Sequence, residues 1–107
     1  MPAAIAVTMG EPAGIAGEIT LKAWQALCAE GPAFFVIGDP DHLDAAARTL
    51  GLSMRAAPID RPEETHSRFH DALPVLPERL SVPSIPGEPD SRNARHVVTA
   101  IDRAVEL

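Results

Sequence analysis

The fold is decided by residues 4–38, which run AIAVTMGEPAGIAGEITLKAWQALCAEGPAFFVIG. Residues 4–9 are short and apolar, a pattern typical of a buried parallel strand. Residues 15–27 then carry apolar side chains at every fourth position, which predicts a helix that ends at the Gly-Pro pair 31–32. Residues 33–38 are apolar again. This strand–helix–strand order predicts an α/β fold with a mainly parallel sheet.

A second unit follows directly. Asp39 and Pro40 predict a helix start, because an Asp side chain caps free amides and proline suits the first helical position. Residues 52–57 predict a third strand, with Arg55 as the weakest point of the pattern. We therefore expect residues 1–57 to form a β-α-β-α-β unit around a sheet of three parallel strands.

The remaining sequence has a different character. Seven prolines lie in residues 58–89, which predict a connection over the surface with short edge strands at 73–76 or 80–82. Residues 90–107 predict a helix that is cut off at the chain end. Its apolar residues share one face and are Val97, Val98, Ile101, Ala104 and Val105.

Composition excludes several protein classes. No apolar run approaches the ~20 residues that a membrane-spanning helix needs, and residues 1–7 lack the basic start of a secretory signal. The net charge of -6 argues against a nucleic-acid partner. The single cysteine, Cys28, cannot form an internal disulfide, so a cytoplasmic setting is the expectation.

The chemistry of the chain is concentrated in residues 8–19, TMGEPAGIAGEI, between the first strand and its helix. Gly10, Gly14 and Gly17 permit close approach of the backbone. Helix amides exposed after Gly14 would bind an anion or the phosphate of a dinucleotide. The spacing matches neither G-x-G-x-x-G nor a Walker A loop. From the residues alone, a structural turn is the more common explanation of such a segment.

Three strings together resemble a known family. They are VTMGEPAGIAGEI at 7–19, FVIGDP at 35–40, and the segment 87–94 ahead of an apolar helix. They are similar to the 4-hydroxythreonine-4-phosphate dehydrogenases of pyridoxine biosynthesis, whose fold resembles that of isocitrate and isopropylmalate dehydrogenases. The resemblance implies that residues 1–107 are the N-terminal portion of a larger dehydrogenase domain, with a partial three-layer α/β/α arrangement.

The resemblance also implies site residues and cofactors. Gly10, Glu11, Gly14 and Ile15 would line the site beside NAD or NADP. The family reaction is oxidation of a phosphorylated 3-hydroxy amino acid followed by decarboxylation, assisted by a divalent metal such as Zn, Mg or Co acting as a Lewis acid. No metal ligand and no catalytic residue of the family maps onto this sequence. We therefore expect a homodimer at full length and no turnover from these 107 residues alone.

Two alternatives to this function stay open. A sister dehydrogenase could act on a phosphorylated sugar acid or an aromatic cis-dihydrodiol. A non-catalytic module could dimerise through an unpaired sheet edge and an apolar helix face. The loop also departs from the family pattern, because Ala16 and Gly17 replace Gly-Pro. If relatives have a left-handed backbone at Ala16, this loop would be strained or rearranged.

Other candidate residues have ordinary explanations as well. His66, His70 and Asp71 form an H-x-x-x-H-D group that could suggest metal binding, although surface histidines are the favoured interpretation. Asp39 could bind a ribose, but its position before Pro40 is explained by capping alone.

We expect His42 to be exposed in the first turn of its helix. His96, near Arg92 and Arg95, is better explained as part of a polar helix face than as an anion site.

Overall fold

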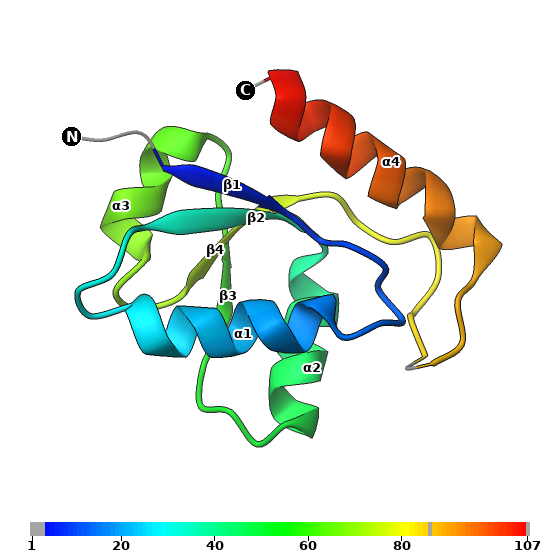
Figure 1. Cartoon of the computed structure of the whole chain (residues 1–107), viewed down its shortest axis with the longest axis horizontal. Helices are drawn as coiled ribbons and strands as arrows, with labels where there is room; N and C mark the ends of the chain where they lie inside the picture. The colour runs from blue at the N-terminus through cyan, green and yellow to red at the C-terminus, as the bar shows by residue number, and fades with distance from the viewer. Residues whose placement is uncertain (1–3, 86, 107) are drawn as a thin grey trace.

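The chain is an α/β unit built on one parallel sheet (Figure 1). The computed structural model describes residues 4–85 and 87–106. The strands of the described part are β1 (Ile5–Thr8), β2 (Phe34–Gly38), β3 (Ala56–Pro58) and β4 (Leu73–Pro77), in the sheet order β1-β2-β4-β3. The helices are α1 (Ala16–Leu27), α2 (Pro40–Thr49), α3 (Thr65–Arg68) and α4 (Ser91–Glu106), with a 3₁₀ turn η1 (Pro62–Glu64) before α3. The predicted α/β class and parallel pairing are confirmed.

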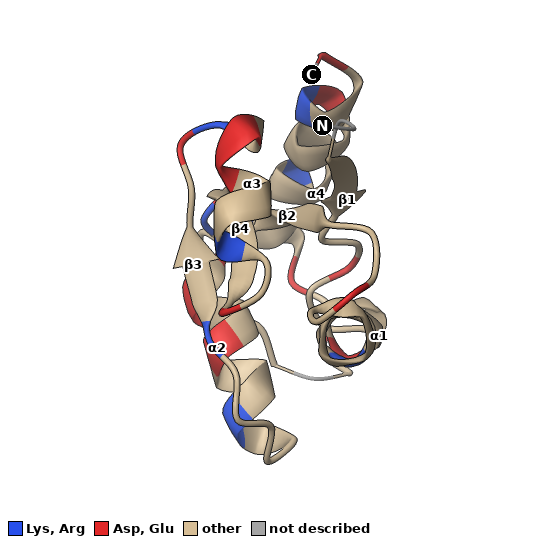
Figure 2. Cartoon of the chain, turned by 90° about the vertical axis from the view of Figure 1, so that its left-hand side faces the viewer, with Lys and Arg blue, Asp and Glu red and all other residues tan. Residues whose placement is uncertain are grey.

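Two apolar cores lie on the two faces of this sheet. The first buries Leu21 and Trp24 of α1 and Leu43 of α2 against β2 and β4. The second buries Phe35 and Ile37 of β2 beneath Ala100 of α4. The sheet therefore lies between a layer made by α1 and α2 and a layer made by α4 (Figure 2), which is the predicted partial three-layer arrangement.

The proline-rich connection differs from its prediction. Residues 73–76 were expected at an edge, but β4 lies between β2 and β3 and is almost wholly buried. Leu73 donates its N–H to Arg55 O at 3.0 Å. Because backbone polar groups alternate in direction along a strand, every second residue of β4, counted from Leu73, directs its backbone toward β3, and the other residues direct theirs toward β2. This alternation puts Pro74 just before the first β2–β4 partners, and Pro77 just beyond the β3–β4 pairing. Neither missing proline N–H therefore interrupts a ladder, and the two prolines are tolerated in an interior strand.

Other boundaries shift by smaller amounts. The third strand covers Ala56–Pro58 rather than 52–57. It pairs with β4, so the sheet has four described strands instead of three. Residues 80–82 are not a strand. The predicted start of α2 is confirmed, since Asp39 Oδ1 accepts the N–H groups of Asp41 and His42.

The face of the final helix that is buried in the structure differs from the apolar face that the sequence predicts. α4 buries Asn93 and Ala100, whereas Val98, Ile101 and Val105 are 59%, 48% and 80% exposed. Polar contacts explain this rotation. Buried Asn93 forms two hydrogen bonds with the backbone of Val82, and Arg103 Nη1 donates to Pro77 O at 2.7 Å.

Candidate functional site

The loop between β1 and α1 is held by its own backbone and by Glu11. Gly10 has φ 65°, and a Cβ placed on it would lie 2.8 Å from Ala16 Cβ, so a side chain is excluded sterically. Glu11 O accepts the N–H of Gly14 at 2.9 Å, and Glu11 Oε1 accepts the N–H of Ala13 at 3.1 Å. Gly10 and Glu11 thus determine the shape of the loop.

No side chain caps the first turn of α1. Ile15 occupies the N-cap position, where it has no side-chain oxygen to accept the first helical amides. The first bond into the helix runs from Ile19 N to Ile15 O at 3.1 Å. Ala16 has an ordinary helical backbone, since no described non-glycine residue has a positive φ. The strain considered for Ala16 is therefore absent, and amides of the first turn are available to an acceptor.

A groove of about 490 Å³ lies over this helix start. Its floor and walls come from the loop, the first turn of α1, the exposed side of α2, and Ser84 and Gly87 of the connection. The described lining residues are Pro12, Ala13, Gly14, Ile15, Gly17, Glu18, His42, Ala45, Ala46, Thr49, Leu50, Ser84 and Gly87. Of the four predicted site residues, Gly14 and Ile15 line the groove, whereas Gly10 and Glu11 are not among its lining residues and shape the loop.

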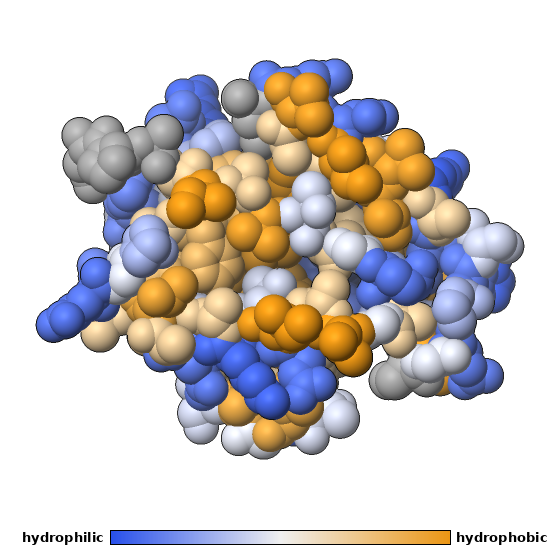
Figure 3. Space-filling view, in the orientation of Figure 1, coloured by the Kyte–Doolittle hydropathy of each residue, from blue (hydrophilic) through white to orange (hydrophobic). Residues whose placement is uncertain are grey.

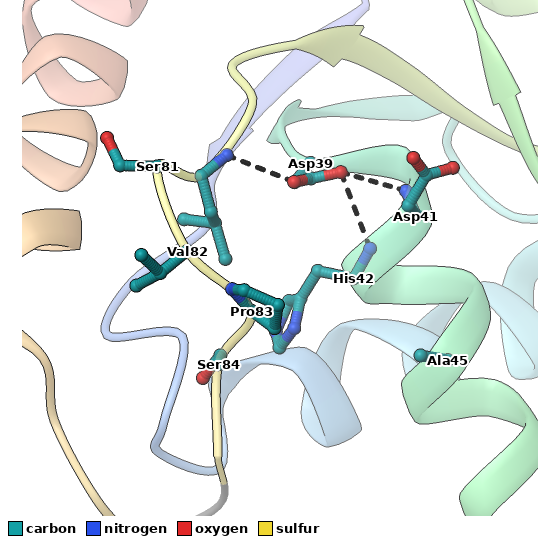
Figure 4. Close-up of a pocket in the computed structure, with 9 residues that line it drawn as sticks. Asp39, Asp41, His42, Ala45, Ser81, Val82, Pro83 and Ser84 are labelled. Carbon is teal, nitrogen blue, oxygen red and sulfur yellow. Dashed lines mark hydrogen bonds between the residues drawn. The ribbon is translucent and has the colours of Figure 1, made fainter.

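A second hollow of about 310 Å³ adjoins the first and shares His42, Ala45 and Ser84 with it. Figure 4 shows its other wall, the chain segment from Ser81 to Ser84 facing the start of α2. Asp39 lies at its upper rim and accepts the N–H of Leu80 through Oδ2 at 3.0 Å (Figure 4). Both carboxylate oxygens of Asp39 are thereby used within the chain, in agreement with capping rather than ribose binding.

His42 is the side chain that sequence analysis missed. It was expected to be exposed, but it is half-buried where the two hollows meet. Burial lowers the pKa of the His42 imidazole below its usual value, and the nearby Asp39 carboxylate opposes this shift only in part. His42 Nε2 lies 4.0 Å from the position that a Cβ on Gly17 would take. The imidazole thus faces the first turn of α1, which local sequence patterns could not reveal.

The H-x-x-x-H-D group, for which surface histidines are the favoured interpretation, lies at α3 and directly after it. His70 Nδ1 donates to Cys28 O at 2.6 Å, which joins the end of α3 to the end of α1. Within residues 4–85 and 87–106, no three His, Cys, Asp or Glu side chains converge in a way that could hold a metal ion. In the same ranges, no helix is long and apolar enough to cross a membrane.

Comparisons with known proteins agree with one another. A 4-hydroxythreonine-4-phosphate dehydrogenase of Methylorubrum extorquens is 45% identical over 106 residues, covering 96% of this chain and 30% of that protein. The enzyme of the same name from Xanthobacter autotrophicus is 41% identical over 107 residues, covering 99% and 30%. No family model matches the chain.

Solved structures lead to the same family. A crystal structure of a 4-hydroxythreonine-4-phosphate dehydrogenase from Burkholderia phymatum superposes with a TM-score of 0.84 at 26% identity, over 100% of this chain and 33% of that one. The corresponding structure from Klebsiella pneumoniae gives a TM-score of 0.78 at 28% identity, over 99% of this chain and 33% of that one.

Over nearly its whole length, the chain is similar to 4-hydroxythreonine-4-phosphate dehydrogenases. It spans about 30% of the length of its curated relatives. The glycine-rich rim of the groove beside α1 coincides with the string that carries this resemblance.

Proposed function

We propose that this chain forms the cofactor-side part of a 4-hydroxythreonine-4-phosphate dehydrogenase. The whole enzyme would oxidise the secondary alcohol of a phosphorylated 3-hydroxy amino acid by hydride transfer to NAD or NADP, and the keto acid would then lose carbon dioxide. It would work as a cytoplasmic homodimer. The observation that carries the proposal is 45% identity to a curated enzyme of that name over nearly the whole chain.

The chemistry of the groove fits a dinucleotide. Gly14 and Gly17 have no side chains, so a pyrophosphate can approach the backbone closely. The uncapped first turn of α1 supplies amide donors there. The Ile15 side chain is 69% exposed and offers an apolar contact for a ring of the cofactor. Gly10 and Glu11 contribute by fixing the loop that presents these groups.

The charged residues near the groove limit what else it can do. Glu18 is paired with Lys22 at 2.9 Å, which offsets its repulsion of a phosphate.

The bound nicotinamide would supply the hydride acceptor. A metal ion does not fit the described residues of this chain, because no group of ligands converges there. The proposed divalent metal would therefore need ligands from another part of the enzyme.

The proposal is tested by titrating NAD and NADP into the ¹⁵N-labelled chain and following amide resonances. We expect millimolar ligand to shift the amides of residues 14–18, and Gly17→Val to abolish these shifts because the new side chain fills the groove. Ala26→Val is the matched control, since Ala26 is exposed further along α1, outside the groove. Unchanged resonances at residues 14–18 in the wild-type chain would exclude the proposed role of the loop.

A further inference from the structure

Three polar side chains form a series of hydrogen bonds between α4 and the segment that follows β4. Glu78 comes directly after β4, Ser81 lies three residues further on, and His96 projects from α4. His96 Nδ1 lies 2.7 Å from Glu78 Oε2, and His96 Nε2 lies 2.7 Å from Ser81 Oγ. The imidazole therefore joins a carboxylate to a hydroxyl, and we call these three residues the Ser81 network.

The partners of His96 determine where its proton lies. A carboxylate only accepts hydrogen bonds, so Nδ1 carries the proton that is donated to Glu78. In the neutral imidazole, Nε2 then has a free electron pair that accepts the Ser81 hydroxyl proton. Arg95 Nη2 donates to Ser81 Oγ at 3.3 Å, which occupies an electron pair of that oxygen. The hydroxyl proton of Ser81 is thus directed at a base that can remove it.

The base and the residue that orients it are held in place, whereas the hydroxyl is accessible. Glu78 donates its N–H to Gly38 O at 2.8 Å, and its Oε1 accepts from Arg103 Nη1 at 3.4 Å. The side chains of His96 and Glu78 are only 13% and 15% exposed. Ser81 is exposed. A reagent in solution therefore reaches the hydroxyl, while the imidazole behind it keeps a fixed orientation.

The Ser81 network lies at the carboxyl ends of the parallel strands, beyond which α/β sheets bind their ligands. None of its members lines the groove over the start of α1. Figure 4 shows the Ser81 hydroxyl directed toward α4, away from the hollow beside α2. Apolar residues follow α4 across the face seen in Figure 3, whereas His96 and Arg103 turn toward the end of β4. The network is therefore distinct from the proposed cofactor groove.

We propose that Ser81 is a nucleophile that takes acyl groups from small activated esters, with His96 as its general base and Glu78 as the positioning residue of that base. A nucleophile, a base and a group that orients the base, each within hydrogen-bond distance of the next, perform serine acyl transfer on several unrelated folds. The inference does not depend on the proposed dehydrogenase activity.

The reaction needs no cofactor. Ser81 Oγ forms a bond to the ester carbonyl carbon while its proton moves to His96 Nε2. The bond from that carbon to the leaving oxygen then breaks, and the leaving group takes the proton from His96. Water releases the acyl group by the same steps, with Ser81 as the leaving group. The guanidinium of Arg95, next to Ser81 Oγ, stabilises the carbonyl oxygen as it gains negative charge.

The Ser81 hydroxyl is not required to hold α4. Asn93 makes two buried hydrogen bonds to Val82, and Arg103 donates to Pro77 O at 2.7 Å. An exposed hydroxyl exchanges its partner for water at little net cost. We therefore expect Ser81→Ala to fold and to keep the urea unfolding midpoint of the wild type, so that its reactivity can be compared directly.

The first test is reaction of the 107-residue chain with para-nitrophenyl acetate, followed by mass mapping of its peptides. We expect an acetyl ester on Ser81 and release of para-nitrophenolate above the rate in buffer. Ser81→Ala should lower this release at least about ten-fold. Ser91→Ala is the matched control, because Ser91 is an exposed serine at the start of α4 outside the Ser81 network, and its variant should react as the wild type does.

The second test separates the base from the residues around it. His96→Gln should slow acetylation of Ser81 at least about ten-fold, and Arg95→Gln at least about three-fold. Glu78→Gln should also slow it, because a carboxamide can donate to Nδ1 and stabilise the other tautomer. The ¹⁵N spectrum of His96 reads that change directly: we expect the proton on Nδ1 in the wild type and on Nε2 in Glu78→Gln. A merely structural role of Glu78 would leave the tautomer unchanged.

Three results would overturn the proposal. A chain without an acetyl ester on Ser81, or with as much on Ser91, has no activated serine in the Ser81 network. A folded Ser81→Ala variant that releases para-nitrophenolate at the wild-type rate places the reaction elsewhere. A folded His96→Gln variant whose Ser81 is acetylated as fast as in the wild type excludes His96 as the base. In each case the network only joins α4 to the segment after β4.

Discussion

The side chain of Asn93 binds both backbone polar groups of Val82: its Oδ1 accepts the Val82 N–H at 3.1 Å, and its Nδ2 donates to Val82 O at 3.0 Å. Asn93 is 3% exposed, so water does not compete effectively for these bonds. One amide thus anchors α4 to the segment that follows β4.

Replacing Asn93 with alanine should destabilise the chain by about 2 kcal/mol, because two buried hydrogen bonds are lost together. Urea unfolding followed by circular dichroism measures this change. Thr99→Ala, at an exposed position of the same helix, serves as control and should change stability by less than about 0.5 kcal/mol. An Asn93→Ala variant as stable as the wild type would show that the anchor is dispensable.

Gly10→Ala and Gly51→Ala form a matched pair at left-handed positions. Gly10 has φ 65° and Gly51 has φ 71°, so both substitutions meet the same backbone penalty, roughly 1 kcal/mol. Only Gly10→Ala also brings a new Cβ to 2.8 Å from Ala16 Cβ, whereas nothing lies within 4 Å at Gly51. We expect Gly10→Ala to be the more destabilising by at least about 1 kcal/mol in thermal or urea unfolding. Equal losses would mean that the loop relaxes freely around the added methyl group.

Asp39→Ala should destabilise α2 by about 1–2 kcal/mol, because Asp39 caps the helix and also accepts the Leu80 N–H. Asp39→Asn should recover part of the loss, since its amide oxygen can still accept one set of these bonds. The readout is urea unfolding at neutral pH. If Asp39→Asn were as damaging as Asp39→Ala, the carboxylate charge rather than its geometry would account for the stabilisation.

The pKa of His42 is lowered from 6.5 by burial, so the unfolded state binds a proton more readily than the folded state. Stability linked to this group is present above the unfolded pKa and is lost as the pH falls through the folded pKa. We expect the free energy of unfolding to decline as the pH falls below about 6.5, and His42→Gln to flatten this decline. Titration of the imidazole resonances provides the direct check, and a midpoint above 6.5 would contradict the burial argument.

Local signals predicted the first half of the chain well. The strand patterns, the spacing within α1 and the Asp39-Pro40 cap depend on neighbouring residues, and each corresponds to an element of the structure. Gly14 and Ile15 line the groove beside α1, and their contact with a cofactor, which the family resemblance implies, stays a prediction.

The errors involve residues far apart in sequence. β4 was placed at an edge because Pro74 and Pro77 suggest it, and only the pairing registers show that both prolines fall at ladder ends. The rotation of α4 is determined by Val82 and Pro77 rather than by its own apolar pattern. Half-buried His42 lines a hollow together with residues 80–84, and no local pattern predicts the path of that segment.

The insertion of β4 between β2 and β3 has a consequence for folding kinetics. β3 precedes β4 in the chain but has no described strand partner other than β4, so it cannot join the sheet until residues 73–77 arrive. Pairing β2 with β4 closes a loop that holds all of α2, β3 and α3, which is an entropically costly, non-local step. During synthesis, β1, α1 and β2 can therefore assemble early. β3 stays unpaired until β4 has left the ribosome.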